Sequence, residues 1–314
     1  MPVKIRQLIS RSPTQWVKGW LRVLGPPFIA LTIVVSLLGA AIVSRNAHLD
    51  LRLWILSALS LVLIHFGTSS LNDYFDFRSG TDNINQTPTP LSGGSRVIQE
   101  GMLSPQALLA GGSLFIAIGS SIGIYLAMLK GWPIFLLGII GVFLAVGYVH
   151  PKVNLSKRGL GEFAVAVSFG PIMLSGVYYV QTQAVDLNVI LIGCLMGLLA
   201  GCTLWINEIP DYEADKTTGK TNWVVRLGKK KASYVYVAWL FLIYFFSLIL
   251  ITNNILPKFS WIVLATLIFS IRSARVALRN YNEVEKLLPA NALTIALTLT
   301  YGILLTIAFL IPQS

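Results

Sequence analysis

The chain has 314 residues, of which 55% are hydrophobic and 12% charged, and its formal net charge is +11. A mean hydropathy of +0.71 excludes an ordinary soluble domain and is typical of a protein that crosses a membrane many times. The positive charge gives no reason to expect a nucleic-acid partner, because it follows membrane topology and no nucleic-acid-binding pattern accompanies it.

Nine apolar runs follow one another along the chain, each long enough for a helix to cross about 30 Å of hydrocarbon. They cover residues 25–43, 52–71, 108–128, 132–149, 161–180, 187–206, 234–252, 258–276 and 290–311. They predict an all-α integral membrane protein in which residues 1–314 form a single polytopic domain. Nothing in these runs indicates an obligate protein partner.

Lysine and arginine are distributed unevenly between the two sides that nine spans define. The amino-terminal tail and the loops after the second, fourth, sixth and eighth spans hold 20 of the 24, and the other side holds Arg45, Arg52, Lys130 and Lys258. The positive-inside rule therefore predicts a cytoplasmic amino terminus and a carboxyl terminus on the opposite side, most simply in the cell's inner (plasma) membrane. The same charge attracts anionic membrane lipid.

Acidic residues are scarce, yet seven of the 13 fall in two short stretches where the second and sixth runs end. The first stretch contains Asn72, Asp73, Asp76 and Asp82, and the second contains Asn207, Glu208, Asp211, Glu213 and Asp215. Positions three or four apart share one face of a helix, so most of each stretch projects together. Clustered carboxylates beside a bilayer are costly to desolvate and repel one another, which indicates a neutralising partner, most simply Mg²⁺. Helix capping with solvated charge is the alternative.

The two acidic stretches repeat an Asn-[Asp/Glu]-x-x-Asp pattern about 135 residues apart. This echo predicts two related four-helix halves, roughly 25–149 and 161–276, followed by a last helix at 290–311. Each pattern also opens a long polar connection, 72–107 or 207–233, on the predicted cytoplasmic side. Loops of this length in a compact bundle are usually functional.

Several basic residues near the acidic stretches could contact a phosphate, although most basic residues on this side would serve only topology. They are Arg78, Arg96, Lys152, Lys157, Arg158, Lys216, Lys220 and Arg226. The better candidates are Lys152, which follows Tyr148, and Arg96, which follows a Gly-rich segment whose backbone can approach a ligand. That segment, 87–95, predicts either ordered turns over a site or a flexible linker. Glu162, in the first turn of the fifth run, is either a helix-dipole feature or a polar contact inside the cavity.

Both acidic stretches match motifs of a known family. Asn72-Asp73-x-x-Asp76 and Asp211-x-x-x-Asp215 resemble the two aspartate-rich motifs of the UbiA superfamily of intramembrane aromatic prenyltransferases, and the resemblance covers nearly the whole chain. Within the superfamily the chain is most similar to the 1,4-dihydroxy-2-naphthoate polyprenyltransferases (MenA). The further strings that carry this likeness are Gly80-Thr81-Asp82, Gly93 to Gly101, Arg158 to Glu162, Phe169-Gly170-Pro171 and Tyr178 to Thr182.

The resemblance implies a UbiA-like bundle of nine helices around a central cavity, closed on the cytoplasmic side by the two long connections and open laterally to lipid. It also implies that a polyprenyl diphosphate binds through Mg²⁺ ions at the two motifs. The implied metal ligands are Asn72, Asp73, Asp76, Asp211 and Asp215, with Asp82 and Glu208 as further candidates. The implied catalytic residues are the four motif aspartates, Lys152 and Tyr148, and the implied substrate contacts are Asn72, Arg96, Asn207, Arg78, Glu162 and Lys216.

The implied reaction is transfer of the polyprenyl group to an aromatic acid. For 1,4-dihydroxy-2-naphthoate the carboxyl group would be lost at the same carbon, as in menaquinone or phylloquinone synthesis, and Arg96 could orient that carboxylate. Departures from the MenA pattern at Gly80, Pro210 and Arg22-Val23 leave open 4-hydroxybenzoate, homogentisate or a chlorophyllide as acceptor, or a terpene cyclase. A membrane transporter is the alternative of another class, but transporters carry charge near the bilayer midplane, and here charge lies at the span ends.

Overall fold

The structure, a computed structural model, describes residues 13–84, 88–89 and 91–312. Over these residues nine helical spans are long and apolar enough to cross a membrane, which confirms the predicted fold class. The spans are α2 (Pro26–Asn46), α3 (Leu51–Ser79), α5 (Pro105–Lys130), α6 (Trp132–Val149), α8 to α9 (Gly161–Thr182), α10 (Leu187–Thr217), α12 (Lys229–Thr252), η3 to α13 (Lys258–Asn280) and α14 (Val284–Leu310). Four short helices flank or connect them, namely α1 (Pro13–Val23), α4 (Thr81–Ile84), α7 (Leu155–Arg158) and α11 (Trp223–Leu227).

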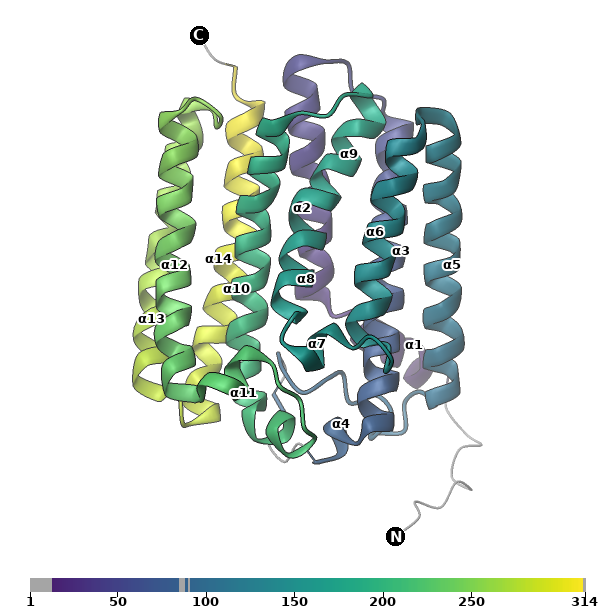
Figure 1. Ribbon diagram of the computed structural model, residues 1–314, viewed down its shortest axis with the longest axis vertical. Helices are drawn as coiled ribbons and strands as arrows, with labels where there is room; N and C mark the ends of the chain where they lie inside the picture. Colours follow the sequence, from purple (N-terminus) through teal and green to yellow (C-terminus); the bar gives the residue numbers. More distant parts are fainter. Residues whose placement is uncertain (1–12, 85–87, 90, 313–314) are drawn as a thin grey trace.

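The spans lie side by side as one bundle, and the short helices gather at one end of it (Figure 1). That end also holds the last turns of α3 and α10, whereas α14 finishes at the opposite end (Figure 1). The two long connections that the sequence places on one side therefore meet at the same end of the bundle. The relation between the halves 25–149 and 161–276 stays a prediction.

The second and sixth spans continue well past their apolar runs, because hydropathy falls where polar residues begin while the helix does not end there. α3 runs to Ser79, where Gly80 takes a left-handed conformation (φ +84°) and ends the helix. α10 runs to Thr217 in spite of the internal Pro210. Both acidic motifs thus lie within helices, and the connections expected from residues 72 and 207 begin about two and three turns later.

The fifth span is two α-helices, α8 (Gly161–Val167) and α9 (Met173–Thr182), joined by the π-helical turn η2 (Ser168–Ile172). Pro171 has no N–H to donate and Gly170 has non-helical dihedral angles (φ −102°, ψ −106°), so the regular helix is interrupted there. A Cβ on Gly170 would lie 2.4 Å from the carbonyl oxygen of Gly193. Glycine at position 170 therefore lets this turn pack directly on α10.

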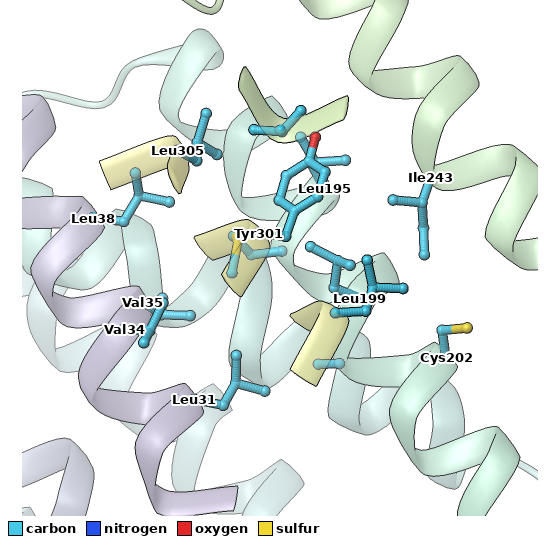
Figure 2. Close-up of a cluster of buried hydrophobic side chains, with 14 of the residues drawn as sticks. Leu31, Val34, Val35, Leu38, Leu195, Leu199, Cys202, Ile243, Tyr301 and Leu305 are labelled. Carbon is cyan, nitrogen blue, oxygen red and sulfur yellow. The ribbon is translucent and has the colours of Figure 1, made fainter. Parts of the chain in front are cut away.

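α10 is the central helix, because 72% of its apolar window is buried, against 17% for α3, α5 and α6. Its Leu195 and Leu199 belong to one buried cluster with Leu38 of α2, Ile243 of α12 and Tyr301 of α14 (Figure 2). Many large apolar side chains of the outer helices remain exposed, as expected of a surface that faces lipid. The packed centre thus fixes the helix that carries the second acidic motif.

Candidate active site

The ends of α3 and α10 that carry the acidic motifs face a common polar chamber of about 180 Å³. Its acidic and amide lining comprises Asn72, Asp76, Asp82, Asn207, Glu208, Asp211, Asp215 and Asn222, with Lys220 among them. A second, largely apolar chamber of about 840 Å³ lies between the spans, and Asn72, Tyr148 and Gly94 line both chambers. A polar and an apolar compartment that share a wall suit a molecule with a charged head and a long apolar tail.

Backbone and hydroxyl groups of residues 91–96 hold two of the motif carboxylates. The backbone N–H of Gly93 donates to Oδ2 of Asp211 at 3.0 Å. Ser95 donates to Asp73 through its backbone N–H, at 3.2 Å, and through its hydroxyl. The segment therefore joins the α3 motif to the α10 motif, as expected of ordered turns over a site rather than of a flexible linker.

Glycine is required where this segment passes closest to the acids. Gly94 has φ +74°, and a Cβ there would lie 2.9 Å from Oδ2 of Asp82. The Gly-rich composition thus serves close approach of the backbone, as the sequence predicted. Residues 85–87 and 90 of this connection lie outside the described residues.

Lys220 is the buried counter-charge of the polar chamber. Its Nζ lies 3.2 Å from Oδ1 of Asp215 and 3.6 Å from Oδ2 of Asp76, and its side chain is 18% exposed. Burial opposes the positive charge of Lys220, but the two carboxylates outweigh burial and hold its pKa well above the usual value. Gly219 (φ +70°) turns the chain back, and the backbone N–H of Lys220 donates to the carbonyl oxygen of Asp215 at 2.9 Å.

Asp82, just beyond α3, is a buried carboxyl group that lines the same polar chamber. Burial raises the pKa of Asp82 to about 8, and the nearby carboxylates of Asp76 and Asp73 act in the same direction. A further cation in the chamber would favour the ionised carboxylate and reverse this shift.

Two further carboxyl groups, Glu208 of α10 and Glu162 of α8, are buried next to each other. They are 8% and 4% exposed and lie within hydrogen-bond range of one another, so both can be ionised only at a cost. Glu162 accepts a bond from the backbone N–H of Trp223 at 3.4 Å but lines neither chamber. Glu208 lines the polar chamber, where a nearby positive charge would offset the free-energy cost of burying its carboxylate.

The acidic and amide oxygens of the polar chamber fit a divalent cation whose shell they fill only in part. Among the described residues, no three His, Cys, Asp or Glu side chains gather into a metal site of their own. The Lys220 ammonium nevertheless stands in as a positive charge that carboxylates of α3 and α10 share. Carboxylate and amide oxygens are ligands of Mg²⁺, which completes its shell with water and phosphate.

The structure brings only part of the predicted basic set to the site. Arg78, Lys152 and Lys216 are exposed and line neither chamber. Arg96 donates to the carbonyl oxygen of Asp82 and also lines neither chamber. These four side chains therefore lie around the polar chamber rather than in it.

Lys220 is the site residue that sequence reasoning passed over in favour of Lys152. Its signal was the Gly219-Lys220 pair directly after the second motif, since a glycine that ends a helix turns the next residues back over it. Tyr148, predicted as a site residue, lines both chambers.

A model of the UbiA prenyltransferase family matches residues 32–298, most of the chain. The chain belongs to the UbiA prenyltransferase family. It is therefore a prenyltransferase and an integral, multi-pass membrane protein, as its motifs and its nine spans predicted.

Relatives of this UbiA chain extend over nearly all of it. The 1,4-dihydroxy-2-naphthoate octaprenyltransferase of Bacillus subtilis is 22% identical over 286 residues, which cover 91% of this chain and 90% of the relative. The 2-carboxy-1,4-naphthoquinone phytyltransferase of Synechocystis sp. is 24% identical over 297 residues, which cover 93% of each chain. A solved structure of a UbiA homologue from Archaeoglobus fulgidus bound to GPP and Mg²⁺ gives a TM-score of 0.59 at 17% identity and covers 92% of this chain and 99% of that one. The UbiA fold is thus shared over nearly the full length.

Proposed function

We propose that this UbiA prenyltransferase transfers a polyprenyl group from a polyprenyl diphosphate to 1,4-dihydroxy-2-naphthoate in a Mg²⁺-dependent reaction. The observation that carries the proposal is the wall shared by a polar chamber of about 180 Å³ and an apolar chamber of about 840 Å³. The head and the tail of a polyprenyl diphosphate match these two compartments. Relatives named for naphthoate substrates, aligned over about nine-tenths of the chain, support the choice of acceptor.

The diphosphate belongs in the polar chamber, against the ends of α3 and α10. The proposed Mg²⁺ ligands are Asn72, Asp73, Asp76, Asp211 and Asp215. Bound Mg²⁺ would supply Lewis-acid stabilisation of the charge that the leaving diphosphate gains. Lys220 lies in the same chamber and would donate to diphosphate oxygens as that charge develops. Arg78, Lys152 and Lys216 stay predicted contacts at the rim.

The proposed reaction breaks one bond and forms another at the first carbon of the prenyl chain. Its C–O bond breaks with the electron pair leaving on the diphosphate, so that an allylic cation or a species close to it remains. The ring carbon of the acceptor that bears the carboxylate attacks this centre. Loss of CO₂ then returns an electron pair to the ring, so no proton has to leave that carbon.

The apolar chamber keeps water from the cationic carbon. Its wall is mostly aliphatic and aromatic, and Tyr148 stands where the two chambers meet. A ring face stabilises positive charge, and exclusion of water prevents hydrolysis of the cation. Arg96 is the proposed partner of the acceptor carboxylate, because it lies in the segment that covers the acids.

We place this site at the cytoplasmic face. The polar chamber lies at the end of the bundle where α3 and α10 finish (Figure 1), and the sequence assigns 20 of the 24 Lys and Arg residues to that side. The positive-inside rule orients such an end toward the cytoplasm.

Purified protein in lipid nanodiscs, with Mg²⁺, a series of prenyl diphosphates and four aromatic acids, tests the proposal by product mass. The expected product is prenylated naphthoate that has lost CO₂. A product from 4-hydroxybenzoate, homogentisate or chlorophyllide alone would reassign the acceptor. A cyclised prenyl product without any acceptor would contradict group transfer.

A further inference from the structure

Asn291 of α14 is an amide that reaches the second acidic motif from the far end of the sequence. It is fully buried, and its Nδ2 donates to the carbonyl oxygen of Ile206 at 3.1 Å and to Oδ1 of Asn207 at 2.7 Å. Asn207 lines the polar chamber one turn before Asp211. Asn291 thus lies behind Asn207 and does not itself line the polar chamber.

The two bonds of Asn291 fix which atom Asn207 turns toward the chamber. A backbone carbonyl only accepts hydrogen bonds, so the group of Asn291 that faces Ile206 must be its NH₂. The same NH₂ faces Asn207, which therefore has to present its oxygen to Asn291. The NH₂ of Asn207 is left on the other side, and among the described residues it has no acceptor.

Asn72, the corresponding residue of the first motif, is oriented the opposite way. Its Nδ2 donates to Oδ2 of Asp76 at 3.3 Å, so its Oδ1 is the atom left without a partner among the described residues. Asn72 lines both chambers. The two asparagines of one repeated pattern thus present an oxygen from α3 and an NH₂ group from α10.

Stability alone does not explain the Asn291 amide. Its own Oδ1 is buried without a partner among the described residues, and such an orphaned acceptor is destabilising compared with an apolar side chain of the same size. Asn291 leaves its Oδ1 without a partner and uses its NH₂ to orient Asn207. This arrangement suits a residue whose role is to position the Asn207 side chain.

We propose that Asn291 is a positioning residue that turns the Asn207 amide into a hydrogen-bond donor for anionic diphosphate oxygens. This inference rests on the proposed function, because it names the head group of the donor as the ligand. Asn207 then binds the anion and makes no bond to the cation, whereas the Asn72 oxygen faces the cation. The two asparagines of the repeated motif would thus have different ligands, Mg²⁺ for Asn72 and the diphosphate for Asn207.

The test compares two ligands on the full-length protein in nanodiscs. Binding of geranyl S-thiolodiphosphate, an unreactive donor analogue, is measured by calorimetry with Mg²⁺, and Mn²⁺ binding without diphosphate is measured by electron paramagnetic resonance. Asn291→Leu should weaken the analogue about 10-fold, the typical worth of one charge-assisted hydrogen bond, with Mn²⁺ affinity changed less than about twofold. Asn207→Asp keeps an oxygen for Asn291 to donate to and should weaken the analogue at least as much.

A matched control separates positioning from packing. Thr298, two turns further along α14, shares a hydroxyl hydrogen bond of 2.8 Å with Thr203 of α10. Thr298→Val removes another bond between the same two helices and should lower the melting temperature without changing analogue affinity. In an Asn207→Ala background, Asn291→Leu should cause no further loss of analogue affinity.

Three results would overturn the inference. The first is unchanged analogue affinity in Asn207→Asp, which remains informative if Asn291→Leu fails to fold. The second is a loss of Mn²⁺ affinity in Asn207→Asp or Asn291→Leu as large as the loss of analogue affinity. The third is a wild-type protein that does not bind the analogue, which would also contradict the proposed function.

Discussion

Nζ of Lys220 lies 3.2 Å from Oδ1 of Asp215, and the two side chains are only 18% and 5% exposed. Oδ2 of Asp76, on α3, lies 3.6 Å from the same Nζ. One positive charge thus ties the end of α3 to the end of α10. Without it, two enclosed carboxylates would face each other.

Lys220→Met should therefore destabilise the metal-free protein and make it depend on divalent cations. Loss of one partner from a buried ion pair leaves uncompensated charge, and we expect the melting temperature in EDTA to fall by roughly 5–10 °C. Mg²⁺ should restore most of this loss, because it neutralises the same carboxylates. Thermal unfolding with EDTA and with Mg²⁺ measures both effects.

Lys216→Met is the matched control, because Lys216 belongs to the same helix end but is exposed. Its melting temperature should stay close to that of the wild type in both conditions. An equal loss for Lys220→Met with and without Mg²⁺ would show that the ammonium is not standing in for a cation.

Removal of a motif carboxylate should abolish prenyl transfer while the protein stays folded. Asp76→Ala removes one carboxylate of α3 from the polar chamber and Asp215→Ala removes one of α10, and we expect each to lower activity on the order of 100-fold or more. Radiolabelled prenyl transfer in nanodiscs measures the loss. Near-normal transfer by both variants would contradict the proposed diphosphate site.

Asp186 provides a control at the other end of α10. Its side chain caps that helix by accepting the backbone N–H of Asn188 at 2.7 Å. Asp186→Ala should cost about 1 kcal/mol of stability but little activity, since the cap is remote from the chamber. The comparison separates loss of chemistry from loss of helix stability.

Sequence periodicity predicted which acidic motif residues would share a helix face, but not which contacts would hold their carboxylates in place. Asn72 and Asp76 are four residues apart, so a helix alone puts them on one face, and the structure has them line one chamber. The bond from Gly93 to Asp211 spans 118 positions and depends on how the connection folds back, which no local pattern reports. Lys152 was preferred to Lys220 for the same reason, since no local pattern reports that the turn at Gly219 brings Lys220 into the polar chamber.

Gly94→Ala should impair donor binding more than the same change at another left-handed glycine. Both Gly94 (φ +74°) and Gly101 (φ +70°) have a backbone that strains a side chain, so both variants should lose roughly 1 kcal/mol of stability. A Cβ at Gly94 also meets Asp82 at 2.9 Å, whereas nothing lies within 4 Å of one at Gly101. Donor KM should therefore rise several-fold for Gly94→Ala and remain near the wild-type value for Gly101→Ala. Equal donor KM values would contradict a covering role for the segment.

Arg96→Ala should raise the KM of the acceptor more than the KM of the donor. Arg96 belongs to the segment over the acids, and a guanidinium can pair with the acceptor carboxylate through two bonds. Arg96→Lys keeps the charge but loses the bidentate geometry, so its acceptor KM should lie between those of Arg96→Ala and the wild type. Equal effects on donor and acceptor would instead assign Arg96 to support of the segment at the Asp82 carbonyl.

Tyr148 should govern how much of the cleaved donor reaches the acceptor rather than water. Its ring lies at the wall shared by both chambers, and a ring face stabilises a nearby cation by about 0.5–2 kcal/mol. Tyr148→Phe keeps the ring and should keep the transfer rate within a few-fold. Tyr148→Leu should lower transfer roughly 10-fold and increase the share of prenyl alcohol, the product of water attack. Mass spectrometry of both products gives the ratio, and Tyr125→Leu, at a half-exposed tyrosine of α5 that lines neither chamber, should leave it unchanged. A phenylalanine variant as impaired as the leucine variant would assign the role to the hydroxyl group and not to the ring.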